Sequence, residues 1–146
     1  MPNWLYLIVN VLYHLGLSLW IGGAVVLGAL VAPALFGKLP RQEAGAIFGP
    51  ILRRFSRVRL GAVIVVILTA AAKHLVWETH ASSIWIVIRW AAIAVMATSV
   101  FYEIFYLEGA LEARRGDSAA FMPLHRRSET LMKVGLIAAI VALFLS

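Results

Sequence analysis

Polar side chains recur at regular spacing in the first apolar stretch of the chain. Asn10, His14, Ser18 and Gly22 follow one another every fourth residue, so a helix would place them on one face. Because unpaired polar groups are costly in hydrocarbon, this face is expected to point at protein or water. His14 lies about 15 Å along such a helix from Trp4. An ionisable group at that depth indicates a ligand-binding site, and the alternative is a neutral imidazole that hydrogen-bonds a neighbouring helix.

A second group of basic side chains is expected near one end of the following two apolar stretches. Lys73 and His74 come late in one stretch and Arg89 comes early in the next, so a tight hairpin would bring them to similar depth. Arg89 then needs a counter-charge or an aqueous cavity, and Glu78 is one candidate partner. If Glu78 pairs elsewhere, Arg89 could receive a carboxylate or phosphate group of a ligand. Snorkelling of these side chains to the interface is the structural alternative.

A carboxylate interrupts the third apolar stretch near its other end. A buried Glu103 there would need a cation, and the fourth helix offers several: His125, Arg126, Arg127 and Lys133. We therefore expect an inner polar cluster of Glu103, His125 and Arg126. A structural ion pair is the simpler interpretation of this cluster, and proton or cation handling is the alternative.

The spacing of the remaining reactive residue types excludes several kinds of active site. The four histidines, His14, His74, His80 and His125, never stand three or four residues from one another. This spacing argues against a zinc hydrolase. The chain also lacks a glycine-rich phosphate loop, a nucleophile elbow and a paired-carboxylate site.

Four long apolar runs must position these side chains. They cover residues 4–31, 60–77, 84–107 and 131–145, and a membrane-spanning helix needs about 20 apolar residues. The fourth run is short and needs the long side chain of Lys133 to reach water. The sequence therefore predicts a single domain, residues 1–146, that is an all-α integral membrane protein with a four-transmembrane up-down helix bundle.

Two stretches between these runs are amphipathic and basic. Residues 40–59 and 117–130 are predicted to lie at the cytoplasmic face, either along the membrane surface or as extensions of the spans that follow them. Both stretches contain Phe-x-Pro-x-x-Arg-Arg, at Phe48 and at Phe121. The bundle could therefore consist of two helical hairpin repeats.

The charge distribution predicts the orientation of the chain. The net charge is +6, and nearly all basic residues lie in the two amphipathic stretches or close to them. The positive-inside rule makes those stretches cytoplasmic and places both termini on the opposite side, with Trp4, Trp77 and Trp85 at the outer interface. We expect the bacterial inner membrane as the location, anionic lipid as the partner and no nucleic acid. A homo-oligomer is also possible.

The absence of cysteine and the composition of the N-terminus add two exclusions. A chain without cysteine has no disulfide, thiolate metal site or redox thiol. Residues 1–3 carry no basic side chain, and the apolar run that follows is too long for a signal-peptide core. The first helix is therefore expected in the mature protein.

Several short elements together resemble the family called domain of unknown function 4149, which includes the mammalian transmembrane protein 205. They are His14, Trp20-Ile-Gly22-Gly23, Ala32-Pro33-Ala-Leu35-Phe36, Pro40-Arg41, Ala44-Gly45 and Pro123-Leu124-His125-Arg126-Arg127-Ser128. Their order and spacing extend over nearly the whole chain. The resemblance implies a small membrane protein that binds or passes a metal ion or metal complex, with His14 as the metal-binding residue.

The first helix is also similar, more distantly, to copper-resistance CopD domains and to the membrane-type protoporphyrinogen oxidase HemJ. That likeness implies haem b bound by a histidine of the first span, here His14, and a lysine in a later span, where this chain has Arg89. The leading hypothesis is a non-enzymatic membrane protein that binds a small ligand at Asn10, His14 and Ser18. The alternatives are a haem-binding or redox protein and a structural assembly partner.

Overall fold

Every secondary-structure element is a helix in the residues that the computed structural model describes, 3–78, 84–114 and 116–146. His80 and the rest of the predicted outer turn lie outside these ranges. The elements are α1 (Asn3–Val25), η1 (Val26–Val31), α2 (Ala32–Lys38), α3 (Arg41–Val76), α4 (Ile84–Tyr102), η2 (Glu103–Leu107), α5 (Glu108–Ala113) and α6 (Ser118–Phe144).

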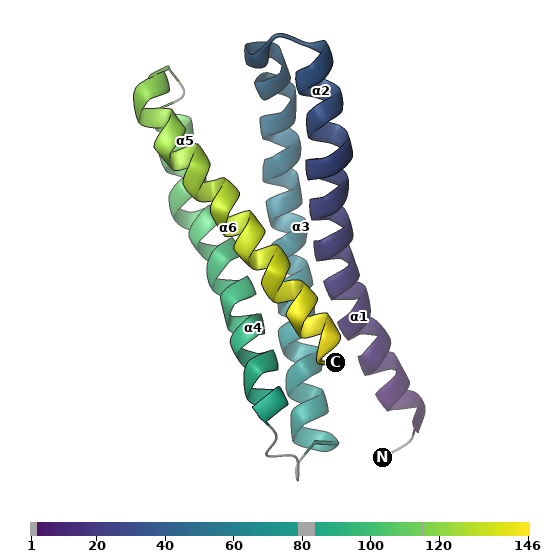
Figure 1. The fold of residues 1–146 in the computed structure, drawn as a ribbon. Coiled ribbons are helices and arrows are strands. Elements are labelled where there is room, and N and C mark those ends of the chain that lie inside the picture. The colour runs from purple at the N-terminus through teal and green to yellow at the C-terminus, as the bar shows by residue number, and fades with distance from the viewer. Residues whose placement is uncertain (1–2, 79–83, 115) are drawn as a thin grey trace.

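The first helix is longer than the predicted span of residues 4–31. α1, η1 and α2 form one continuous helix to Lys38, coloured purple to blue in Figure 1. Pro33, in the first turn of α2, lacks an N–H group and crowds the carbonyl four residues before it. The wider turns of η1 accommodate it, since the amide of Ala32 bonds to the carbonyl of Leu27, five residues back.

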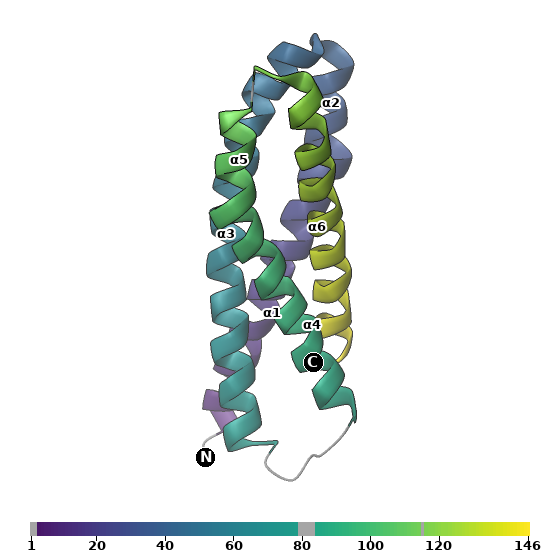
Figure 2. The same ribbon diagram turned by 90° about the vertical axis from the view of Figure 1, so that its left-hand side faces the viewer.

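α3 contains both the second apolar run and the amphipathic stretch before it. The amphipathic stretch 40–59 and the apolar run 60–77 form one helix that continues through Pro50 to Val76. The stretch 40–59 is therefore an extension of the helix that contains the apolar run, the second of the two predicted arrangements. α3 runs beside α1 and α2 in the opposite direction, as Figures 1 and 2 both show.

The second half of the chain is built in the same way. α4, η2 and α5 follow one another without a break, and α6 returns along α4 and also packs on α1. Asp117 caps α6, because its carboxylate accepts hydrogen bonds from the amides of Ala119 and Ala120. The predicted stretch 117–130 is the first half of α6 and its cap.

Small residues let the helices approach closely at two points in the core. A Cβ on Gly16 would lie 2.8 Å from Val66 Cγ2, and a Cβ on Gly135 would lie 2.8 Å from Ser99 Oγ. In a membrane the lipid tails are as apolar as the side chains, so there is no hydrophobic driving force between helices. Close van der Waals contact then holds the helices together. The fully buried core around these points includes Tyr13, Leu17, Trp20, Val63, Val66, Met96, Val100 and Ala139.

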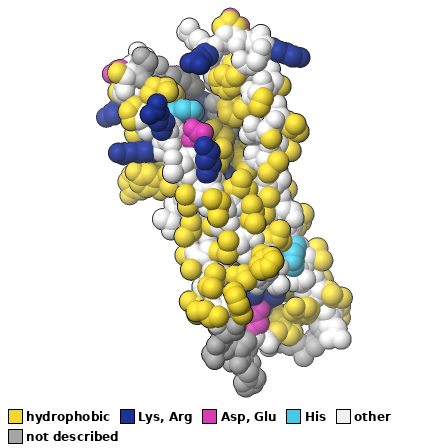
Figure 3. All heavy atoms as spheres, viewed as in Figure 1, with side chains coloured by type: hydrophobic (Ala, Val, Ile, Leu, Met, Phe, Trp, Pro, Cys, Tyr) yellow, Lys and Arg dark blue, Asp and Glu magenta, His cyan; other side chains and the backbone are white. Residues whose placement is uncertain are grey.

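Within the described residues, three helices are long and apolar enough to cross a membrane: Asn3–Lys38, Arg41–Val76 and Ile84–Ala113. α6 is not one of these helices. Its last 18 residues contain three charged side chains, Arg127, Glu129 and Lys133, which is more than in the apolar stretches of the other three. Figure 3 shows hydrophobic side chains over the middle of one face, with lysine and arginine side chains gathered at its upper end. The chain is thus a helical membrane protein.

Candidate functional site

Two polar clusters lie at opposite ends of the apolar core. The outer cluster is formed by Asn10 and His14 of α1, Lys73 and His74 of α3, Arg89 of α4, and Glu78 just after α3. The inner cluster is formed by Ser56 and Arg59 of α3 and Glu103 of η2. Each cluster joins helices that are far apart in the sequence.

Lys73 is the most deeply buried cation of the outer cluster. Its side chain belongs to a residue only 3% exposed, and Nζ donates to Asn10 Oδ1 at 3.1 Å. The same ammonium lies 5.0 Å from the ring centroid of Tyr13 and 6.0 Å from that of Tyr6. These rings offer cation–π stabilisation, yet an ammonium has three N–H donors and Asn10 accepts one of them.

Arg89 pairs with Glu78, the first of the two arrangements considered for it. Arg89 Nη1 donates to Glu78 Oε1 at 3.0 Å, and Nη2 bonds to Oε2. The hydrogen bond from Arg89 holds the pKa of Glu78 below its usual range, against an opposing effect of burial. Arg89 Nε is buried and has no hydrogen-bond partner among the described residues.

His74 stands at the edge of this pair. Its Nδ1 lies 3.9 Å from Glu78 Oε2, and its ring contacts Trp90 edge to face at a centroid distance of 6.4 Å. The predicted grouping of Lys73, His74 and Arg89 at one depth is therefore seen in the structure.

The predicted polar stripe of the first helix is only partly inside the protein. His14 is half-buried, its Nδ1 is 2.7 Å from the carbonyl oxygen of Asn10, and its Nε2 is 2.9 Å from Ser146 Oγ. Ser18 and Gly22 are exposed on the surface of α1. The stripe drifts around the helix because four residues exceed one turn of 3.6, so Ser18 does not share a site with Asn10 and His14.

The inner carboxylate is buried, but its expected partners were wrong. Glu103 is 3% exposed and pairs with Arg59, whose Nη2 lies 2.6 Å from Glu103 Oε2. Ser56 Oγ donates to Glu103 Oε1 at 3.1 Å and accepts from Arg59 Nη2 at 3.0 Å. The cation therefore comes from α3, because η2 faces α3 at this level as well as α6.

Arg59 is the most fully enclosed charged residue in the described part of the chain. It is 0% exposed, and its guanidinium carbon lies 5.4 Å from the ring centroids of both Trp20 and Phe55. Arg59 Nε and Nη1 and Trp20 Nε1 are buried without a hydrogen-bond partner among the described residues. From the sequence, Arg59 was expected only as one of the basic residues of the cytoplasmic stretch 40–59. Its position three residues after Ser56, on the same helix face, was the available sign that the two side chains could interact.

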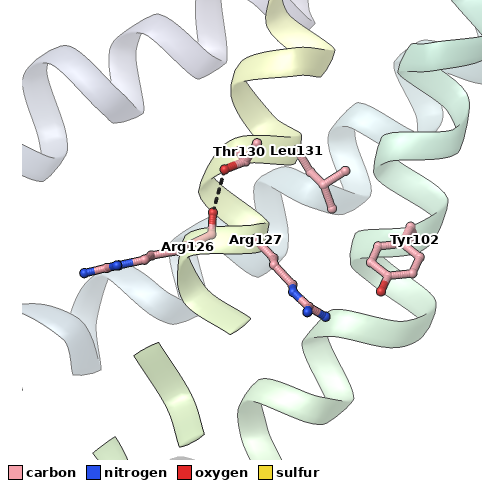
Figure 4. A pocket seen from close by; sticks show the side chains of 5 residues that line it. All are labelled: Tyr102, Arg126, Arg127, Thr130 and Leu131. Atoms are coloured by element: carbon pink, nitrogen blue, oxygen red, sulfur yellow. Dashed lines mark hydrogen bonds between the residues drawn. The ribbon is translucent and has the colours of Figure 1, made fainter. Parts of the chain in front are cut away.

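His125 and Arg126 lie on the exposed side of α6, away from the buried carboxylate. The His125 ring stacks on Phe121 at a centroid distance of 5.8 Å. Figure 4 shows Arg126 directed away from Tyr102 and Arg127 directed toward it. The predicted inner cluster of Glu103, His125 and Arg126 is thus not assembled in this structure.

Several residues that carry the family resemblance have packing roles. Trp20 and Ser128 are buried, Phe36 packs edge to face on Phe48, and a Cβ on Gly23 would collide with the Phe55 ring. The others are half-buried or exposed in the described chain: Gly22, Pro33, Gly45 and Pro123.

The donor set does not fit a metal centre held by the protein. Within residues 3–78, 84–114 and 116–146, no three His, Cys, Asp or Glu side chains are grouped so that they could hold a metal ion. Both ring nitrogens of His14 already have hydrogen-bond partners, so metal or haem ligation would require one of these contacts to break.

Comparison with known proteins identifies the family. The family model described as Domain of unknown function (DUF4149) matches residues 15–120. This match includes Lys73, Arg89, Arg59 and Glu103, whereas His14 precedes it. No curated protein and no solved structure gave a match. Because the model covers more than half of the sequence, the chain belongs to the DUF4149 family.

Proposed function

We propose that this protein is a four-helix integral membrane protein that binds a small ligand at its outer polar cluster. The observation that carries the proposal is a surplus of buried donors. Lys73 has one acceptor for three N–H groups, and Arg89 Nε has none among the described residues. Unsatisfied polar groups in apolar surroundings are costly, so an acceptor brought by a ligand would lower the free energy of this cluster.

The charge of the cluster indicates what kind of group the ligand carries. Lys73 and Arg89 supply two positive charges, and Glu78 supplies one negative charge. A carboxylate, phosphate or anionic metal complex would neutralise the remaining charge, whereas a free metal cation would add to it. We therefore propose that the ligand places an anionic group beside Lys73, and not that a free metal ion binds at His14.

The position of α6 supports access to this cluster. Ser146 contacts His14 and Tyr13 donates to the carbonyl of Ala142, so α6 ends beside these α1 residues. α1, α3 and α4 continue beyond that point in Figures 1 and 2. α6 thus ends short of the first turns of α1, near the half-buried Asn10.

Membrane placement follows from the aromatic and basic residues. With the exposed Trp4 and Trp85 at the outer interface, a hydrocarbon layer of about 30 Å reaches the level of Arg59 and Glu103. α6 would then be the fourth helix in this layer, with its basic first half toward the cytoplasm and its C-terminal end, beside His14, short of the outer interface. We propose the bacterial inner membrane as the location, with both termini on the non-cytoplasmic side.

One observation favours assembly as a second role. Ser18 and Gly22 are exposed on an otherwise apolar helix, and small or polar residues are typical of helix–helix contacts in membranes. A second copy of the chain could cover them without affecting the outer cluster, which faces inward.

The ligand proposal is tested by calorimetry on the detergent-solubilised protein. The probes are benzoate, citrate, inorganic phosphate, zinc citrate and free Zn²⁺. We expect at least one anionic probe to bind, and Lys73→Met to weaken that binding about tenfold or more, as expected for one charge-assisted hydrogen bond of about 1.5–3 kcal/mol. The matched control, Lys133→Met, removes an exposed lysine and should change affinity less than about twofold.

Three outcomes would contradict the proposal. They are no binding of any anion, equal effects of the two lysine variants, and binding of free Zn²⁺ that His14→Ala abolishes. The last outcome would favour the metal site expected from the sequence. A Soret band in protein purified from haem-supplemented cells would favour haem instead.

A further inference from the structure

A basic hollow lies between α4 and α6 at the inner end of the molecule, away from the outer cluster. Its volume is about 440 Å³, it is open on one side, and it is lined by Tyr102, Arg126, Arg127, Thr130 and Leu131. Figure 4 shows that the Arg127 side chain extends from α6 toward the Tyr102 ring on the neighbouring helix.

The two arginines of this hollow have no acidic partner in the described chain. The nearest carboxylate in sequence, Glu129, accepts a hydrogen bond from Lys133 at 2.8 Å instead. That bond holds the pKa of Glu129 below its usual range, so the Glu129 carboxylate is ionised and pairs with Lys133. The hollow therefore holds the uncompensated guanidinium group of Arg127 beside the Tyr102 phenol, while the Arg126 side chain is directed away from that ring.

The exposed surface of the helices next to the hollow is apolar in the direction of the middle of the bundle. Thr130 is followed at helical spacing by Val134 and Ile137, both exposed on α6. On the neighbouring helix, Tyr102 stacks on Tyr106, and both rings are exposed. Positive charge at one end and exposed apolar surface beyond it match an amphiphile with an anionic head and hydrocarbon tails.

We propose that this hollow binds the phosphate headgroup of an anionic phospholipid. The Arg127 guanidinium group matches phosphate oxygens in a bidentate geometry, and the Tyr102 hydroxyl offers a further hydrogen bond. The acyl chains lie along Val134 and Ile137, in the lipid-facing surface of α6. Basic pockets between helices on the cytoplasmic side commonly hold such headgroups, and aromatic rings are enriched at this depth.

This site would also explain how α6 is held in the membrane. The apolar part of α6 is short, and Arg126 and Arg127 stand where a longer span would have apolar residues. A phosphate beside Arg127 and Tyr102 would compensate positive charge at the interface. The site is independent of the outer cluster, so either proposal can fail without the other.

The test compares lipid binding by the full chain in neutral detergent micelles, measured by native mass spectrometry and titration. The probes are dioleoyl phosphatidylglycerol, dioleoyl phosphatidylcholine and inorganic phosphate. We expect preferential binding of phosphatidylglycerol, and a loss of about tenfold or more in the double variant Arg126→Gln/Arg127→Gln. Arg127→Lys, which keeps the charge but not the planar fork, should lie between this variant and the native protein.

The matched control is Arg54→Gln, an exposed arginine of α3 outside the hollow. It should change lipid binding less than about twofold. An equal loss in Arg54→Gln would show a net-charge effect and overturn the site. Equal binding of phosphatidylcholine, or binding of inorganic phosphate as tight as that of the lipid, would also overturn it. Unchanged circular dichroism of the variants verifies their folding.

Discussion

Two buried cations of this protein are stabilised in different ways. Arg59 has a direct counter-charge, Glu103, and a hydroxyl from Ser56 that bonds to both. Lys73 has a neutral amide oxygen and two aromatic rings. The charge of Arg59 is therefore compensated within the protein, although its Nε and Nη1 lack acceptors among the described residues, whereas the surroundings of Lys73 leave a positive charge for which a ligand is the natural partner.

The structural role of the Arg59–Glu103 pair can be measured. Glu103→Gln leaves Arg59 buried without a counter-charge, so we expect a loss of about 3–5 kcal/mol in the free energy of unfolding. Replacing both residues, Arg59→Met with Glu103→Leu, should recover most of that loss because no lone charge remains. Unfolding in mixed micelles followed by circular dichroism gives both values.

An exposed ion pair serves as the control for this experiment. Glu129→Gln breaks the contact with Lys133 and should cost less than about 1 kcal/mol. If Glu103→Gln were as harmless as Glu129→Gln, the buried pair would not stabilise the fold.

At the scale of elements, α1 and α3 depend on close approach at glycine. Gly16 faces Val66 and the carbonyl of Ala62, whereas Gly22 has open space around it. Both glycines lie in the same helix, so helix propensity affects them equally. Their difference reports packing alone.

We therefore predict opposite effects of alanine at these two positions. Gly16→Ala introduces a methyl group into the contact with the stiff Val66 side chain and should destabilise the protein by about 1–3 kcal/mol. Gly22→Ala should be neutral or should stabilise by up to about 1 kcal/mol through helix propensity. Thermal unfolding in detergent distinguishes them, and equal effects would contradict the observed α1–α3 packing.

Prolines also act at this scale, in a way that differs with their position. Pro33 coincides with the wide turns of η1, and Pro50 and Pro123 lie inside α3 and α6 without ending them. Because the helices continue past these prolines, the first helix, α3 and α6 are all longer than the predicted spans. The basic inner ends of the helices are thus direct continuations of the helices that are predicted to cross the membrane.

For the whole molecule, the basic residues predict orientation. Lys38, Arg41, Arg126 and Arg127 lie toward one end of the bundle, and both termini lie toward the other. Alkaline phosphatase fused after Ser146 should therefore be active in a bacterial host, because this enzyme folds only outside the cytoplasm. The same enzyme inserted at Gly116 should be inactive. The reverse pattern would show that the positive-inside rule fails for this chain.

The sequence was sufficient for contacts that are local. Helix positions follow from apolar runs, and the Arg89–Glu78 pair follows from a short connection between consecutive helices, which limits the distance between them. The cap at Asp117 is likewise a matter of neighbouring residues. Helix ends were underestimated because amphipathic extensions carry charges that hydropathy treats as a boundary.

Which helix faces are in contact was decided by the tertiary structure. Glu103 had cations available on two helices, and periodicity alone could not tell that Arg59 of α3 faces it while Arg126 points to the surface. Ser18 left the predicted site for the same reason, since rotation about a helix axis depends on its packing partners. The amino-acid order by itself determined a helical membrane protein and its local pairs, because hydrophobicity and chain connectivity act along the sequence. Side-chain partners between distant helices depend on the relative rotation of the packed helices, which arises only when the bundle assembles.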